Sequence, residues 1–161
     1  MKYGLLFLLV TWVVGCASAP PVQTLRFHEQ VSGNLPLEHA RPIVVPSTRQ
    51  QLAINPLSTL TERDVLAAKL TPTTGGDAIL LKFDAHGANV LAEVTTRLRG
   101  QSLVVFVNDR PIASLLIEHA NATGQLLLTG DLTDEQTKAL VDSLNKVTKR
   151  RPAAATTKPE H

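Results

Sequence analysis

The sequence predicts an α+β fold of the ferredoxin-like type, in which an antiparallel sheet carries helices packed on one face. Two observations lead to this expectation. From Ile79 onward, strand-like and helix-like segments follow one another in the order β-α-β-β-β-α. Both helix-like segments place their apolar residues three or four positions apart, so that each has one apolar face to bury against a sheet.

The first half of the chain contributes short strand-like segments that are interrupted by prolines. Residues 25–28 alternate apolar and polar side chains, residues 43–45 are an apolar run between two prolines, and residues 51–54 follow. Because proline cannot donate a ladder hydrogen bond, we expect these segments at sheet edges or strand ends. Residues 61–64 have the pattern of a helix cap, which predicts one or two helical turns over residues 65–68.

Four strands are expected in the second half. Residues 78–83 form an apolar run typical of a buried strand. Residues 102–107 and 112–118 are two further runs, and Asn108-Asp109 between them predicts the tight turn of a β-hairpin. Residues 125–129 complete the set.

Two helices are expected between and after these strands. Asp84 can cap a helix over residues 85–98, which Gly100 would end. Residues 133–136, Thr-Asp-Glu-Gln, form a capping box that starts a second helix running to about residue 148.

Composition indicates one ordinary globular domain. The chain has 161 residues, of which 43% are hydrophobic and 19% charged, and we expect the domain to cover residues 24–148. The net charge of +2 is too small to indicate nucleic-acid binding. Residues 149–161 are rich in proline, alanine and threonine and carry several basic residues, which predicts a disordered basic tail. Cys16 is the single cysteine, so no intrachain disulfide can form.

The first 15 residues have the pattern of an export signal. Lys2 precedes the apolar run Tyr3–Val14, which is too short for a helix that crosses a hydrocarbon core of about 30 Å. The segment Val13-Val14-Gly15-Cys16 resembles a bacterial lipobox, and this resemblance implies diacylglycerol attachment at the Cys16 thiol. Residues 16–23 would then be a tether, and Ala17 after the cysteine implies the outer membrane, with the domain facing the periplasm. The alternative is an ordinary secretory signal, cleaved after residues 17–19.

The chain offers little that could carry catalysis or hold a metal. It has five histidines, none paired at helical ligand spacing: His28, His39, His86, His119 and His161. A zinc site would have to combine the distant His28, His39 and His119. The carboxylates Asp131, Asp134 and Glu135 are better explained as the start of a helix, where they offset the macrodipole. With no nucleophile–base pattern, we expect no enzyme, no cofactor and no small-molecule substrate.

Residues 78–147 resemble the head of the first periplasmic region of SecD, an accessory membrane subunit of the bacterial protein-export translocase. The resemblance lies in four matched segments and one upstream of them: 79–88, 93–95, 100–114, 124–136 and 56–65. Two details depart from the family pattern, in which an Asp-Gly turn and an Ala-Pro pair stand where this chain has Asn108-Asp109 and Ser114-Leu115.

The resemblance implies a protein-binding head without the membrane-embedded machinery. We therefore expect a lipid-anchored envelope module that contacts exported or envelope proteins, by adding a strand to a sheet edge or through a hairpin face. The alternative is a structural docking subunit of an envelope or secretion assembly. In neither case does the sequence name the partner.

Overall fold

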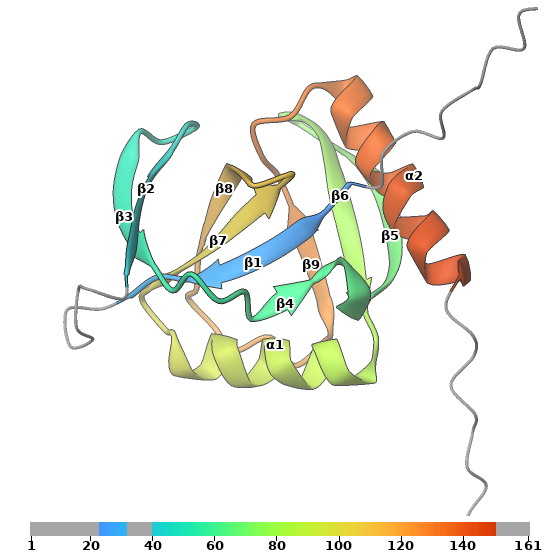
Figure 1. Cartoon of the computed structure of the whole chain (residues 1–161). Coiled ribbons are helices and arrows are strands. Elements are labelled where there is room, and N and C mark those ends of the chain that lie inside the picture. The colour runs from blue at the N-terminus through green and yellow to red at the C-terminus, as the bar shows by residue number, and fades with distance from the viewer. Residues whose placement is uncertain (1–22, 32–39, 151–161) are drawn as a thin grey trace, which may run out of the picture.

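The structure is a computed structural model that describes residues 23–31 and 40–150. They form two α-helices, a short 3-10 helix and three antiparallel sheets, which confirms the expected α+β class and is consistent with a ferredoxin-like fold (Figure 1). In chain order the elements are β1 Leu25–Glu29, β2 Arg41–Val45, β3 Gln50–Ile54, β4 Leu60–Thr61, η2 Glu62–Asp64, β5 Val65–Thr73, β6 Gly76–Phe83, α1 Ala85–Arg97, β7 Ser102–Val107, β8 Arg110–Leu116, β9 Gln125–Leu128 and α2 Asp134–Arg150. No helix in this described part is long and apolar enough to cross a membrane.

The larger sheet has four strands in the order β4-β1-β7-β8. Its central strand β7 pairs with both β1 and β8, so that Val105 lies opposite Phe27 on one side and Ala113 on the other. Every residue of β7 is buried, which is expected for a strand covered on both faces.

The β2–β3 hairpin covers the outer face of this sheet. Val45, Leu52 and Ile54 of the hairpin form a separate apolar cluster with Val104 and Phe106 of β7. In Figure 1 the hairpin stands on the side of the sheet away from β5 and β6. The prolines of this region are accommodated as the sequence predicts, because β2 is the edge strand of a two-stranded sheet.

The main core lies between the four-stranded sheet and a three-stranded sheet of order β5-β6-β9. Phe27 of β1 and Phe83 of β6 meet edge to face across it, with ring centroids 5.8 Å apart. Helix α1 contacts β4 and β6, whereas α2 lies along β5 and β6. Leu91 of α1 and Leu140 of α2 are both fully buried in this core.

The turns and caps that the sequence predicts are present. Asn108 and Asp109 have φ of 50° and 63°, the left-handed conformation that a type I′ hairpin turn requires. The Asp84 side chain accepts a 2.8 Å hydrogen bond from the Gly87 N–H at the start of α1. Thr133 and Gln136 exchange the two hydrogen bonds of the capping box before α2.

The prediction of helical turns over residues 65–68 is wrong. The cap itself exists, because Thr61 and Asp64 form a capping box, but it closes only the short η2 helix. Residues 65–68 instead begin β5, which pairs with the whole length of β6. The Ala68 N–H and C=O are both bonded to the Asn145 side chain of α2. These contacts with distant residues outweigh the local helix signal. The sequence alone could not reveal them.

Candidate functional site: a cleft between two sheet edges

Several residues that the sequence singles out lie outside the described part of the chain. These are Cys16 with the leader and most of its tether, His39, and His161 with most of the basic tail. Lys149 and Arg150, the first two residues of the predicted tail, are the last residues of α2. The tether is described only at its last residue, Gln23, whose N–H donates a 2.9 Å hydrogen bond to the Ser143 hydroxyl of α2. The anchor at Cys16 therefore remains a prediction.

The described histidines do not come together. His28 is buried, donates from Nδ1 to the Asn55 carbonyl oxygen at 2.9 Å and packs edge to face on Phe106. His86 and His119 are exposed on α1 and in the loop after β8. Within residues 23–31 and 40–150, no group of three His, Cys, Asp or Glu side chains is placed to hold a metal ion.

The acidic residues before α2 have contacts of their own. Asp131 forms a 3.9 Å ion pair with Arg110 at the surface. Asp134 and Glu135 lie in the first turn of α2, where carboxylates offset the helix dipole. Their position agrees with the helix-start role that the sequence suggests.

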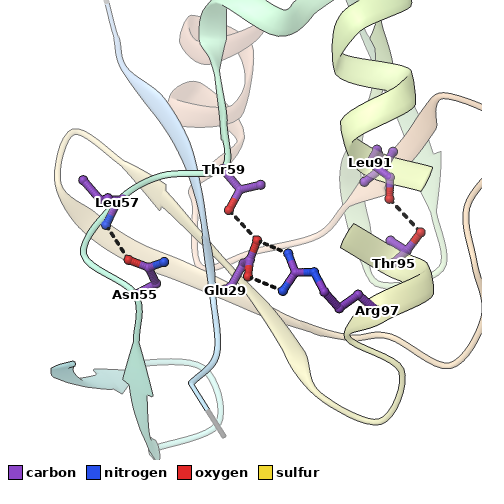
Figure 2. Close-up of polar contacts among 7 residues, drawn as sticks. All are labelled: Glu29, Asn55, Leu57, Thr59, Leu91, Thr95 and Arg97. Atoms are coloured by element: carbon purple, nitrogen blue, oxygen red, sulfur yellow. Dashed lines mark hydrogen bonds and ion pairs between the residues drawn. The ribbon is translucent and has the colours of Figure 1, made fainter. Parts of the chain in front are cut away.

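A second polar cluster joins α1 to the four-stranded sheet. Arg97 at the end of α1 donates from both guanidinium nitrogens to the Glu29 carboxylate of β1, at 3.0 and 2.8 Å (Figure 2). The Thr59 hydroxyl donates to the same carboxylate at 2.8 Å. Burial acts most strongly on Glu29 and would raise its pKa, but the hydrogen bonds from Arg97 and Thr59 together outweigh it, and the pKa is lowered. The hydrogen bond to Glu29 in turn raises the pKa of Arg97. This cluster is a structural clamp that holds α1 in place.

The feature best suited to binding is the seam between β8 and β9, the adjacent edge strands of the two larger sheets. At one end the strands are joined, because the Asp131 N–H donates a 2.9 Å hydrogen bond to the Ile112 carbonyl oxygen. Gly130 permits this approach, since a Cβ there would lie 3.2 Å from the same oxygen. We call Ile112, Gly130 and Asp131 the closed end of the seam.

At its other end the seam opens into a cleft. A cavity of about 240 Å³ lies there, with a floor from α1 and β7 and walls from β8, β9 and the loop between them. Leu116 of β8 lines this cavity and is 62% exposed, and Leu127 of β9, next to the lining residue Leu126, is 47% exposed. We call these two residues, together with the cavity beside them, the open end. Apolar side chains, among them Leu91, Leu103, Leu115 and Leu126, make up most of the cavity's lining, and the remaining residues are polar or charged: Thr95, Glu118, His119 and Asn121.

The loop from β8 to β9 keeps the cleft open by satisfying its own polar groups. The Asn121 N–H donates to the Thr95 hydroxyl of α1 at 2.7 Å, and its side-chain amide donates to the Gln125 carbonyl oxygen at 2.7 Å. Thr95 itself donates to the Leu91 carbonyl oxygen, as Figure 2 shows. These bonds place the loop against α1 instead of across the gap between β8 and β9.

A larger depression of about 490 Å³ lies against the β2–β3 hairpin. Its described lining belongs to that hairpin alone, from Pro42 to Val44 and from Gln51 to Ala53. Among the described residues, no second element lines this depression.

Sequence reasoning named neither Leu116 nor Leu127 as part of a site. The available signal was weak: Leu115, Leu116 and Ile117 form an apolar run that breaks the alternation of a half-buried strand. The structure shows that Leu115 and Ile117 face the core while Leu116 is exposed.

Two solved structures of SecDF are similar to this chain. One is of SecDF described as a membrane component that enhances protein export; it is 20% identical, with a TM-score of 0.58 over 75% of this chain and 61% of that one. The other is of SecDF in a super-membrane-facing form, 19% identical, with a TM-score of 0.57 over 75% of this chain and 18% of that one. The chain shares its fold with part of SecDF.

The expected resemblance to SecD is thus supported at the level of the fold. The chain spans less than two thirds of each of these SecDF chains. No family model and no curated protein matches its sequence.

Proposed function

We propose that this protein is a lipid-anchored module of the bacterial cell envelope that binds exported or envelope polypeptides in the periplasm. The module would act without translocase activity of its own and without catalysis. Its support comes from two sides: the lipobox-like segment ending at Cys16, and a fold shared with a protein described as enhancing protein export. The Ala17 residue after the cysteine favours the outer membrane over the inner one.

The observation that carries the binding role is the open end of the seam. Exposed leucines beside an apolar cavity are a costly surface for a protein in water, and such surfaces mark interaction sites. The cavity is smaller than the roughly 300–1,000 Å³ of typical small-molecule sites, so it suits a side chain of a larger partner better than a free ligand.

Binding is tested with an unfolded secreted protein. Reduced, carboxymethylated α-lactalbumin, labelled with a fluorophore, is titrated with the full chain in detergent, and the anisotropy is followed. We expect saturable binding of this probe and none of the folded, disulfide-bonded form. Binding of neither form would contradict the proposed function, and binding of the folded form alone would favour a docking subunit instead.

The anchor is tested separately. Cys16→Ser should abolish incorporation of radioactive palmitate and release the mature chain from the membrane fraction, because the thiol is the acceptor. Ser18→Ala, two residues away in the tether, is the matched control and should change neither readout. Palmitate labelling that persists in Cys16→Ser would contradict the lipoprotein assignment.

A further inference from the structure

The main-chain groups of β8 alternate between its partner β7 and the seam. The Ile117 N–H donates to the Gln101 carbonyl oxygen at 2.9 Å, so residue 117 faces the β7 side. Ser102, which lies opposite Leu116, directs its N–H and C=O to Gln30 instead. By the alternation of an antiparallel ladder, the N–H and C=O of Leu116 and Ser114 therefore point into the seam.

The same reasoning applies to β9. The Phe83 N–H donates to the Gly124 carbonyl oxygen, so residues 124, 126 and 128 face β6. Leu127 lies between them and directs its main-chain groups into the seam. Continuing the Ile112–Asp131 register two steps at a time along both strands would place Leu116 opposite Leu127. Among the described residues no ladder joins β8 to β9, and no hydrogen bond reaches the seam-facing groups of Leu116 or Leu127.

The edges of β5, β3 and β2 are each obstructed. On β5, Ala68 is bonded through both main-chain groups to Asn145, and the Val65 carbonyl oxygen accepts from Thr148. On β3, the Ala53 carbonyl oxygen accepts from the Val31 N–H. On β2, Pro42 lacks an N–H to donate. Natural proteins block edges in these ways to prevent unwanted strand pairing, which makes an edge left accessible beside a cavity notable.

We propose that an extended, apolar segment of a bound polypeptide adds to the β8 edge as an extra strand, hydrogen-bonded to Ser114 and Leu116. This proposal rests on the proposed function and assigns it a place and a mode. Only an extended chain offers donors and acceptors at the two-residue spacing of this edge, which identifies the occupant as polypeptide. Alternate side chains of the added strand point to the cavity, where an apolar one is buried over Leu91 and Leu103.

The experiment removes one seam-facing donor. Ser114→Pro eliminates the N–H that points into the seam and spares the bonds that β8 makes to β7, whereas Ser114→Ala keeps that N–H. The probe is a short fluorescein-labelled peptide of alternating threonine and valine, titrated with the full chain in detergent. We expect Ser114→Pro to weaken binding at least tenfold and Ser114→Ala to leave it within about twofold of the unsubstituted protein.

A second measurement needs no variant of the protein. The same peptide carrying N-methyl groups on its threonines cannot donate from those residues to β8 when its valines face the cavity. We expect this peptide to bind the unsubstituted chain at least tenfold more weakly than the unmethylated peptide. Circular dichroism shows whether Ser114→Pro folds. If it does not, the comparison of the methylated and unmethylated peptides still tests the proposal.

The outcomes separate the inference from the function. If unfolded α-lactalbumin binds, yet both the proline substitution and N-methylation leave peptide affinity unchanged, strand addition is overturned and the binding function stands. If neither probe binds at all, both are overturned. If size-exclusion chromatography shows a dimer that Ser114→Pro converts to a monomer, a second copy of the chain occupies the edge and the polypeptide proposal is overturned.

Discussion

The two ends of the β8–β9 seam lie a few residues apart on the same strands, yet they are built differently. At the closed end, Ile112 is fully buried and its carbonyl oxygen is bonded to the Asp131 N–H. At the open end, Leu116 and Leu127 are largely exposed beside a cavity. At the closed end, Gly130 allows the two backbones to come into contact. At the open end, the Asn121 N–H is bonded to Thr95, which holds the loop against α1.

The comparison shows that closure here depends on backbone contact more than on apolar attraction. Leucines face the solvent at the open end, so hydrophobicity alone does not draw the strands together there. The closed end then supplies stability, while the open end remains available for a partner. This division between a stable region and a binding region is common where a rigid scaffold positions a site.

The largest expected effect comes from truncating one leucine-sized side chain at each end. Ile112→Ala should lower the free energy of unfolding by about 2–5 kcal/mol, because it removes buried methyl groups and leaves a cavity. Leu116→Ala should change it by less than about 0.5 kcal/mol, because that side chain is exposed. Urea denaturation followed by circular dichroism measures both. Equal losses for the two variants would show that the seam is closed along its whole length in solution.

A smaller effect is expected where Gly130 meets Ile112. In Gly130→Ala the new Cβ would lie 3.2 Å from both the Ile112 carbonyl oxygen and its Cδ1, so the strands must separate by a few tenths of an ångström. We expect a loss of about 1–2 kcal/mol and faster amide exchange at Asp131. Gly75→Ala is the matched control, because a Cβ there meets nothing within 4 Å. A loss of stability in the control equal to that in Gly130→Ala would contradict the role assigned to close approach.

The sequence predicts those parts of the fold that depend on local chemistry. The bounds of β7 agree with the expected strand over residues 102–107, and the Asn108-Asp109 turn has the positive φ values expected of it. The cap at Asp84 and the capping box at Thr133 also form as expected. Each of these features is decided by residues within a few positions of one another, so a single sequence contains the information.

The candidate site depends on contacts between distant residues, and for that reason it could not be predicted. Asp131 reaches Ile112 only after β9 has returned along β8, and the cavity at the open end is lined by a loop that is bonded to Thr95 of α1. The one site residue that the sequence names, Cys16, lies outside the described part of the chain. Strand β5 shows the same limit, because Asn145 on α2 holds residues that look helical in isolation.

The smallest expected effect tests whether the open end depends on the position of α1. Leu91 and Thr95, which line the cleft, belong to α1, and the bidentate contact between Arg97 and Glu29 fixes the end of that helix. Glu29→Gln should cost about 1 kcal/mol at neutral pH, because a neutral amide replaces a charged hydrogen-bond acceptor. Amide exchange should quicken at Asn121, whose N–H is bonded to Thr95 of α1, and remain unchanged at Asp131, since the closed end has no contact with this clamp.

The pH dependence of this cost has a definite sign. The pKa of Glu29 is lowered from its ordinary value of 4.5 in the folded protein, so its carboxylate stabilises the fold fully above that value. As the pH falls below 4.5 toward the folded pKa, the carboxylate takes up a proton and the advantage over Glu29→Gln should disappear. Asp77→Asn, at an exposed position, is the control. A difference between the unsubstituted chain and Glu29→Gln that stays constant from pH 7 to pH 3 would mean that the clamp acts through shape alone, and the open end would then owe nothing to the charge of Glu29.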